Sequence, residues 1–97
     1  MKYGSVARMR LKPGAEDQMR QLTDADAGKI PGFAFSHVYR LDSGSNEYYL
    51  VVAFESREAY NANADNPEQH QRYLKYRELM EADPEWHDGE IVSSYPS

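Results

Sequence analysis

The segment at residues 48–55, YYLVVAFE, constrains the fold of this 97-residue chain more than any other. Side chains alternate between the two faces of a β-strand, so every second residue shares a face. One face would carry Tyr48, Leu50, Val52 and Phe54, and the other Tyr49, Val51 and Ala53. Both sets are apolar or aromatic, which predicts a central strand that is covered on both faces.

The segments before it predict a strand, a helix and a second strand. Residues 3–11 alternate with the period of a strand, and apolar residues recur at helical spacing over 15–27. Residues 33–41 alternate again and precede the turn-forming loop DSGSNE. A loop that short predicts an antiparallel hairpin with the segment at 48–55.

The segments after it predict two helices and a last strand. Helices are expected over residues 56–64 and 67–81, because Ser56 and Asn66 are good N-cap residues. The sequence GEIVSSY, at 89–95, predicts the last strand.

The order β-α-β-β-α-β is typical of an α+β, ferredoxin-like domain, in which helices cover one face of an antiparallel sheet. We expect one such domain over residues 1–97. One sheet face stays uncovered in a monomer, although the central strand is apolar on both sides. The pattern therefore predicts a homodimer that buries the second face.

Composition excludes several classes of partner and site. The formal net charge is −5 and the basic residues are scattered, which argues against nucleic acid and anionic membranes. No apolar run approaches the roughly 20 residues of a membrane span, so we expect a cytoplasmic protein. There is no cysteine, and no histidine pair has the spacing of a metal site. We expect neither a metal nor another cofactor, since no phosphate-binding or dinucleotide motif is present either.

The helix predicted over 67–81 carries the first candidate site residues. Helical spacing places one stripe toward the sheet, formed by His70, Tyr73, Leu74, Arg77 and Met80. His70 lies near the helix N-terminus, where the dipole favours a neutral ring that can exchange a proton. The alternative is a structural histidine at the boundary of the core.

His37 is the second candidate, because strand alternation places it in a row with Phe33, Phe35 and Tyr39. The alternation does not say which sheet face this row occupies. A core histidine with satisfied ring nitrogens is favoured over a pocket residue.

Three further residues could border a cleft beside the sheet. Tyr60 and Asn63 lie three positions apart on the helix predicted over 56–64, and Trp86 could close the end of the cleft. Ordinary packing explains each of them as well. His87 follows Trp86 in an acidic segment and is expected to be solvated.

The chain resembles the antibiotic biosynthesis monooxygenase family of the dimeric α/β-barrel superfamily. The resemblance is carried by MRLKPGAEDQM, IPGFAFSHVYR, EYYLVVAFESREAYNA, NPEQHQRY and PEWHDGEI, in that order. It implies a homodimer with a pocket in each subunit, and oxidation of small aromatic or polyketide substrates by O2 without a metal or flavin. Our hypothesis for such a pocket has His70 as proton acceptor, and Asn63 and Tyr73 as donors that orient an oxygen atom. The expected substrate-binding residues are Tyr60, Trp86, His37 and Arg77.

Three alternatives differ in function. The first is a small-molecule-binding or stress-associated dimer of the same superfamily without turnover. The second is the haem-degrading branch, whose Asn and Trp positions fall here on Ala7 and near Asn63, so that only His70 has a counterpart. The third, the RNA-recognition motif, is set aside because Glu47 stands where that motif needs a basic residue.

Overall fold

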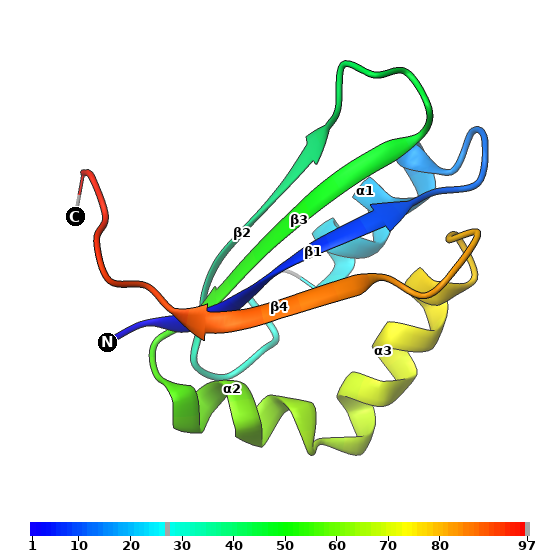
Figure 1. Ribbon diagram of the computed structural model, residues 1–97. Coiled ribbons are helices and arrows are strands. Elements are labelled where there is room, and N and C mark those ends of the chain that lie inside the picture. Colours follow the sequence, from blue (N-terminus) through cyan, green and yellow to red (C-terminus); the bar gives the residue numbers. More distant parts are fainter. Residues whose placement is uncertain (27, 97) are drawn as a thin grey trace.

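The computed structural model describes residues 1–26 and 28–96, which form a four-stranded antiparallel sheet and three helices (Figure 1). The elements in chain order are β1 (Tyr3–Arg10), α1 (Glu16–Asp26), β2 (Phe33–Arg40), β3 (Glu47–Phe54), α2 (Arg57–Ala64), α3 (Pro67–Arg77) and β4 (Glu85–Glu90). The predicted ferredoxin-like order is confirmed. Residue 27, the predicted end of the first helix, and residue 97 lie outside the described part of the chain.

The strand order is β2-β3-β1-β4, so β3 is an inner strand as predicted. It pairs with β2 in the expected hairpin and with β1 on its other side. All three helices lie on one side of the sheet (Figure 1). The opposite face of the sheet is therefore open.

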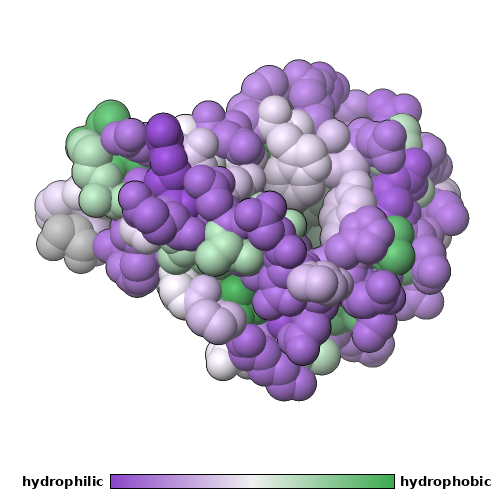
Figure 2. Space-filling model, turned by 90° about the horizontal axis from the view of Figure 1, so that it is seen from below, coloured by the Kyte–Doolittle hydropathy of each residue, from purple (hydrophilic) through white to green (hydrophobic). Residues whose placement is uncertain are grey.

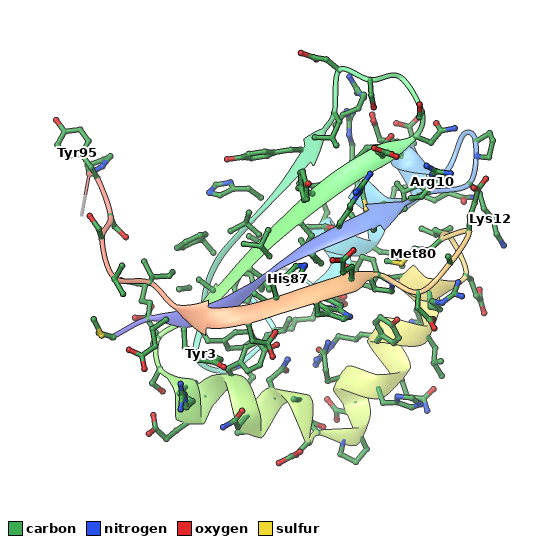
Figure 3. All side chains as sticks on the ribbon, in the orientation of Figure 1. Tyr3, Arg10, Lys12, Met80, His87 and Tyr95 are labelled. Atoms are coloured by element: carbon green, nitrogen blue, oxygen red, sulfur yellow. The ribbon has the colours of Figure 1, made fainter. Side chains whose placement is uncertain are left out.

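The core lies between one end of the sheet and α1. Alternation along β1 directs Ala7 and Met9 toward the helices, where both are buried, while Arg8 and Arg10 are exposed. The buried cluster contains Met9, Leu11, Ala15, Met19, Tyr48 and Met80. Figure 3 shows Met80 in the segment that follows α3, next to the end of β1. Since this cluster fills only one end of the interface between helices and sheet, the other end is free for a cavity.

The two predicted N-caps are confirmed. Ser56 Oγ accepts a hydrogen bond from the Ala59 backbone N–H at 3.0 Å and starts α2. Asn66 Oδ1 accepts one from the Glu68 N–H at 2.9 Å, with Pro67 as the first residue of α3. These caps fix where the two helices begin.

The predicted end of α3 at residue 81 is wrong, because the helix ends at Arg77. The chain then turns to pair with the end of β1. The Lys12 N–H donates to the Leu79 carbonyl at 2.8 Å, and the Glu81 N–H donates to the Arg10 carbonyl at 3.0 Å. This pairing satisfies backbone groups that a longer helix would have used internally.

The predicted position of the last strand is also wrong. β4 spans Glu85–Glu90 and pairs with β1, whereas the expected strand began at Gly89. All six of its residues are exposed. An edge strand rich in charge forms through backbone pairing with its neighbour and gives no hydrophobic alternation.

A β-bulge breaks the predicted row in β2. Phe33 pairs with Phe54, but the next aligned pair is Phe35 with Ala53, so Ala34 is an extra residue. One extra residue moves the following side chains to the opposite face. Phe33 therefore packs edge-on against Phe54, with ring centroids 5.6 Å apart, on the helix-covered side. The prediction that it shares a face with Phe35, His37 and Tyr39 is wrong.

The open face of the sheet exposes apolar and aromatic side chains. Val6 and Tyr39 are 42% and 57% exposed. Register places them with His37, Tyr49, Val51 and His87 on this side of the sheet. No helix in residues 1–26 or 28–96 is long and apolar enough to cross a membrane.

Candidate functional site

A cavity of about 510 Å³ lies between the sheet and the three helices, next to the core cluster, whose Met9, Met19 and Met80 form part of its wall. Figure 2 views the molecule from the side of α2 and α3 and shows a hollow bordered by pale, weakly polar side chains. Every strand and every helix of the described fold contributes to the lining. This volume is typical of a site for a small organic ligand.

Apolar side chains form most of the cavity wall. The strands contribute Met9, Phe33, Val38, Leu50, Val52, Phe54 and Trp86, and the helices and loops contribute Met19, Ile30, Ala64 and Met80. The strand residues point to the helix-covered face because they alternate along their strands with residues of the open face. The wall suits the rings of a flat aromatic molecule.

The Tyr60 hydroxyl and the Asp88 carboxylate form one polar part of the lining. Tyr60 Oη donates a hydrogen bond to Asp88 Oδ1 at 3.1 Å. Burial, followed by this bond to a carboxylate, raises the pKa of Tyr60 to about 12. The Tyr60 ring is fixed by edge-on contacts with Tyr3 and Phe54, at centroid distances of 5.1 and 5.6 Å. Figure 3 shows Tyr3 at the end of β1 that lies over α2.

A second polar part combines side chains of α1 and α3. Tyr76 Oη donates to Asp26 Oδ2 at 3.3 Å, and Arg72 Nη1 donates to Gln69 Oε1 at 3.2 Å. Burial raises the pKa of Tyr76. The cavity thus has two separate polar regions joined by an apolar wall.

Asn63 and Tyr73 line the cavity and are both half-buried. Within residues 1–26 and 28–96, neither the Asn63 amide nor the Tyr73 hydroxyl has a hydrogen-bond partner. Burial raises the pKa of Tyr73, so its hydroxyl stays protonated at neutral pH and can donate. Both groups are available to hold oxygen substituents of a ligand.

Four of the seven predicted site residues lie together. The cavity brings together Tyr60, Asn63, Tyr73 and Trp86. Trp86 is 43% exposed and lies in β4. What these residues do to a ligand stays a prediction.

The predicted orientation of His70 toward the sheet is wrong, because its side chain is exposed and does not line the cavity. Leu74, on the same predicted stripe, is 42% exposed. The face of α3 that lines the cavity is formed instead by Gln69, Arg72, Tyr73 and Tyr76. The helix is therefore rotated by about one residue, or roughly 100°, from the expected orientation. The predicted catalytic role of His70 stays a prediction that this geometry does not support.

His37 and Arg77 also lie outside the cavity. The bulge in β2 places His37 on the open face, where its ring lies 5.4 Å from that of Phe35. Arg77 donates to Asp83 Oδ1 at 2.7 Å and to the Met80 carbonyl at 3.1 Å. Its guanidinium thus holds the turn after α3. His87 is exposed as predicted, and its ring lies 3.0 Å from Glu85 Oε1.

Sequence reasoning missed seven polar residues of the lining, which are Thr23, Asp26, Ser36, Gln69, Arg72, Tyr76 and Asp88. Arg72 and Tyr76 are four positions apart, and a stripe drawn through them would have included Gln69 and Tyr73. The sequence pattern does not single out Asp88, because the charged edge strand β4 has no hydrophobic alternation that would predict which face this residue occupies. No group of three potential metal ligands is present in the described part of the chain.

Comparisons with known proteins give one family and several structures. The family model for antibiotic biosynthesis monooxygenases matches residues 3–75. SnoaB from Streptomyces nogalater, a cofactor-independent oxygenase, is 17% identical with a TM-score of 0.78, and the match covers 99% of this chain and 98% of that one. Rv0793 from Mycobacterium tuberculosis is 18% identical with a TM-score of 0.73, over 98% and 99% of the two chains. At these identities the structures show a shared fold. A comparison with curated protein sequences gives no match.

Proposed function

Because the chain belongs to the antibiotic biosynthesis monooxygenase family, we propose that it is a cofactor-independent monooxygenase that oxidises a small aromatic, polyketide-like substrate in this cavity. The observation that carries the proposal is the cavity itself. It combines an apolar wall with the side chains of Asn63 and Tyr73, which have no hydrogen-bond partner among the residues that the structure describes. SnoaB, which shares the fold, is a cofactor-independent oxygenase.

The proposed chemistry uses electrons from the substrate. An anthrone or quinol that loses a proton becomes an electron-rich anion, which can transfer electrons to O2. In an anthrone the ring methylene then becomes a carbonyl, with one oxygen atom of O2 in the product and the other in water. In a quinol one ring C–H becomes C–OH while the two hydroxyls become quinone carbonyls, again with the second oxygen atom in water. The protein has to favour the anion, orient it and exclude water.

Asn63 and Tyr73 would donate hydrogen bonds to the oxygen atoms on which negative charge develops. Such donors act strongly in a cavity that excludes water. Tyr60 and Trp86 would contact the rings of the substrate. The Asp88 carboxylate, hydrogen-bonded to Tyr60, would accept the proton in place of His70. This assignment uses side chains that line the cavity.

We further propose a cytoplasmic homodimer. The homodimer is supported by the apolar side chains on the open face of the sheet. The central strand β3 carries such side chains on this face as well as on the face that lines the cavity. Burial of that face against a second copy would leave each cavity within one subunit.

Oxygen consumption with a panel of anthrones and quinols tests the proposed activity. We expect Asn63→Ala to lower the rate by about 100-fold to 1,000-fold, the cost of removing one donor to a developing oxyanion. Asn61→Ala is the matched control, because Asn61 is an exposed asparagine on the same helix outside the cavity. His70→Ala should resemble the wild type.

Three results would contradict the proposal or parts of it. Absence of oxygen uptake with every substrate would leave a binding protein without turnover. Equal rates in Asn63→Ala and Asn61→Ala would remove Asn63 from the mechanism. A large loss of oxygen-uptake rate in His70→Ala, with no loss in Asn63→Ala, would identify His70 on α3 as the proton acceptor.

A further inference from the structure

Arg72 places a cation in the wall of a mostly apolar cavity. It lies in the middle of α3, on the face that also carries Gln69, Tyr73 and Tyr76. Its side chain is only 16% exposed. Arginine is rarely buried to this extent unless its charge is paired. The partners of this guanidinium therefore matter.

The guanidinium is poorly paired by the protein. It has five N–H donors, and within residues 1–26 and 28–96 its one hydrogen bond runs from Nη1 to Gln69 Oε1 at 3.2 Å. The carboxylate in ion-pair contact is Glu68, whose Oε2 lies 3.6 Å from Nη2. That carboxylate is 81% exposed, so water screens it strongly. Most of the donor capacity of Arg72 is left for a ligand.

The other charged groups of the lining are the carboxylates of Asp26 and Asp88. Each accepts a hydrogen bond from a tyrosine hydroxyl, Asp26 from Tyr76 and Asp88 from Tyr60. Asp26 accepts the hydrogen bond of Tyr76, which lies one turn from Arg72 on α3, so the two charges belong to the same part of the cavity. A bound anion would be attracted by Arg72 and repelled by Asp26 and Asp88, so its negative group has to contact the guanidinium directly. The described cavity offers an anion one cationic position.

From this arrangement we propose that the cavity selects aromatic carboxylic acids in their ionised form, with the carboxylate bound to Arg72 and the rings against the apolar wall. A planar guanidinium with free N–H groups matches the two oxygens of a carboxylate. The apolar lining favours a ring system over a sugar or a peptide. This inference rests on the proposed function, because it names a substrate class for the same cavity.

Binding of a matched ligand pair tests the selectivity without any turnover. Titration calorimetry would compare 2-naphthoate with 2-naphthamide, which has the same rings and no charge. We expect the wild type to bind the carboxylate more tightly by about 10-fold to 100-fold, the ratio given by a hydrogen-bonded ion pair in a partly buried site. Arg72→Gln should remove this preference and change amide binding little.

Lys75→Gln is the matched control, because it removes the same charge from an exposed position on the same helix, outside the cavity. It should keep the preference for the carboxylate. Arg72→Lys should retain part of it, and circular dichroism checks that each variant is folded. Equal binding of the two ligands by the wild type, binding of neither, or an equal effect of Arg72→Gln and Lys75→Gln would overturn the proposal. The calorimetry measures binding and no oxidation. Its result therefore does not depend on the outcome of the oxygen-uptake assay, and the two proposals can fail separately.

Discussion

Glu16 accepts hydrogen bonds from side chains of three different elements. Its carboxylate receives bonds from Arg40 at 2.6 and 2.7 Å, from Tyr48 at 2.9 Å and from Arg20 at 2.8 Å. Arg40 belongs to the edge strand β2 and Tyr48 to β3. The cluster therefore ties the start of α1 to the sheet beside the cavity. The bonds from Arg40, followed by that from Tyr48, lower the pKa of Glu16 to about 2.

This lowered pKa makes the stability of the fold depend on pH in a defined window. The folded chain binds the proton of Glu16 more weakly than the unfolded chain, so the ionised carboxylate stabilises the fold. The contribution is complete above the ordinary value of 4.5 and is lost as the pH falls from there to about 2. We predict that Glu16→Gln lowers the free energy of unfolding at pH 7, and that its difference from wild type shrinks below pH 4.5.

Urea unfolding at a series of pH values measures this difference. Asp17→Asn is the matched control, because Asp17 lies on the same first turn and its side chain is 84% exposed. A difference between Glu16→Gln and wild type that is equally large at pH 3 and pH 7 would contradict the assignment. The same urea midpoint for both variants at pH 7 would contradict it as well.

Sequence patterns predict some features of the helices and strands and not others. Alternation in β1 and β3 and the N-caps Ser56 and Asn66 were predictable, because burial and capping act locally. The orientation of α3 was not. Tyr73 lies on both the expected stripe and the observed one, which differ by about one residue, and packing of Tyr76 against the core selects the observed one.

The errors in the candidate site follow from these elements. Rotation of α3 exchanges His70 for Gln69 and Arg72 in the cavity wall. The extra residue in β2 moves His37 to the open face. Both depend on contacts between segments distant in sequence, which periodicity does not contain. Tyr60, Asn63 and Trp86 were found from their residue types, because aromatic and amide side chains beside a sheet suit the wall of a cleft.

Gly32 sets how closely α2 approaches the hairpin. Its φ is +74°, a left-handed conformation, and a Cβ atom added there would lie 2.6 Å from the Ala59 Cβ. Ala59 belongs to α2, which also carries Tyr60 and Asn63. A side chain at residue 32 would therefore push α2 away from the strands, and the cavity wall with it.

We predict that Gly32→Ala destabilises the protein more than Gly28→Ala does. Gly28 has a similar φ of +76° but open space around it, so that its replacement costs only the backbone strain of about 1 kcal/mol. The contact with Ala59 should add about 1–3 kcal/mol of overpacking. Thermal and urea unfolding of both variants measures the difference. Equal losses would mean that α2 adjusts freely and that Gly32 does not set its position.

In the whole molecule, strand β3 contributes side chains to two surfaces, the cavity wall and the open face of the sheet. Leu50 and Val52 of β3 line the cavity, while Tyr49 and Val51 between them point to the open face. A substitution on the open face thus leaves the cavity side chains in place. This separation allows the proposed assembly and the proposed activity to be tested independently.

Val51 lies near the middle of the open face. It pairs with His37 on β2 and with Val6 on β1, and Val6 pairs with His87 on β4. A charge at this position would be buried without a partner if two sheets packed together, which is strongly unfavourable. We therefore predict that the wild type sediments at twice the mass of one chain and that Val51→Lys sediments as a monomer.

Sedimentation velocity over a range of protein concentrations measures both masses. Val92→Lys is the control, since Val92 follows β4 and is 80% exposed, so a lysine there should leave the dimer intact. The Val51→Lys monomer should still bind 2-naphthoate more tightly than 2-naphthamide, because Arg72 and the apolar wall belong to one subunit. A monomeric wild type, or a dimeric Val51→Lys, would contradict assembly through the open face. Loss of ligand selectivity on dissociation would instead show that the second copy is needed to complete the cavity.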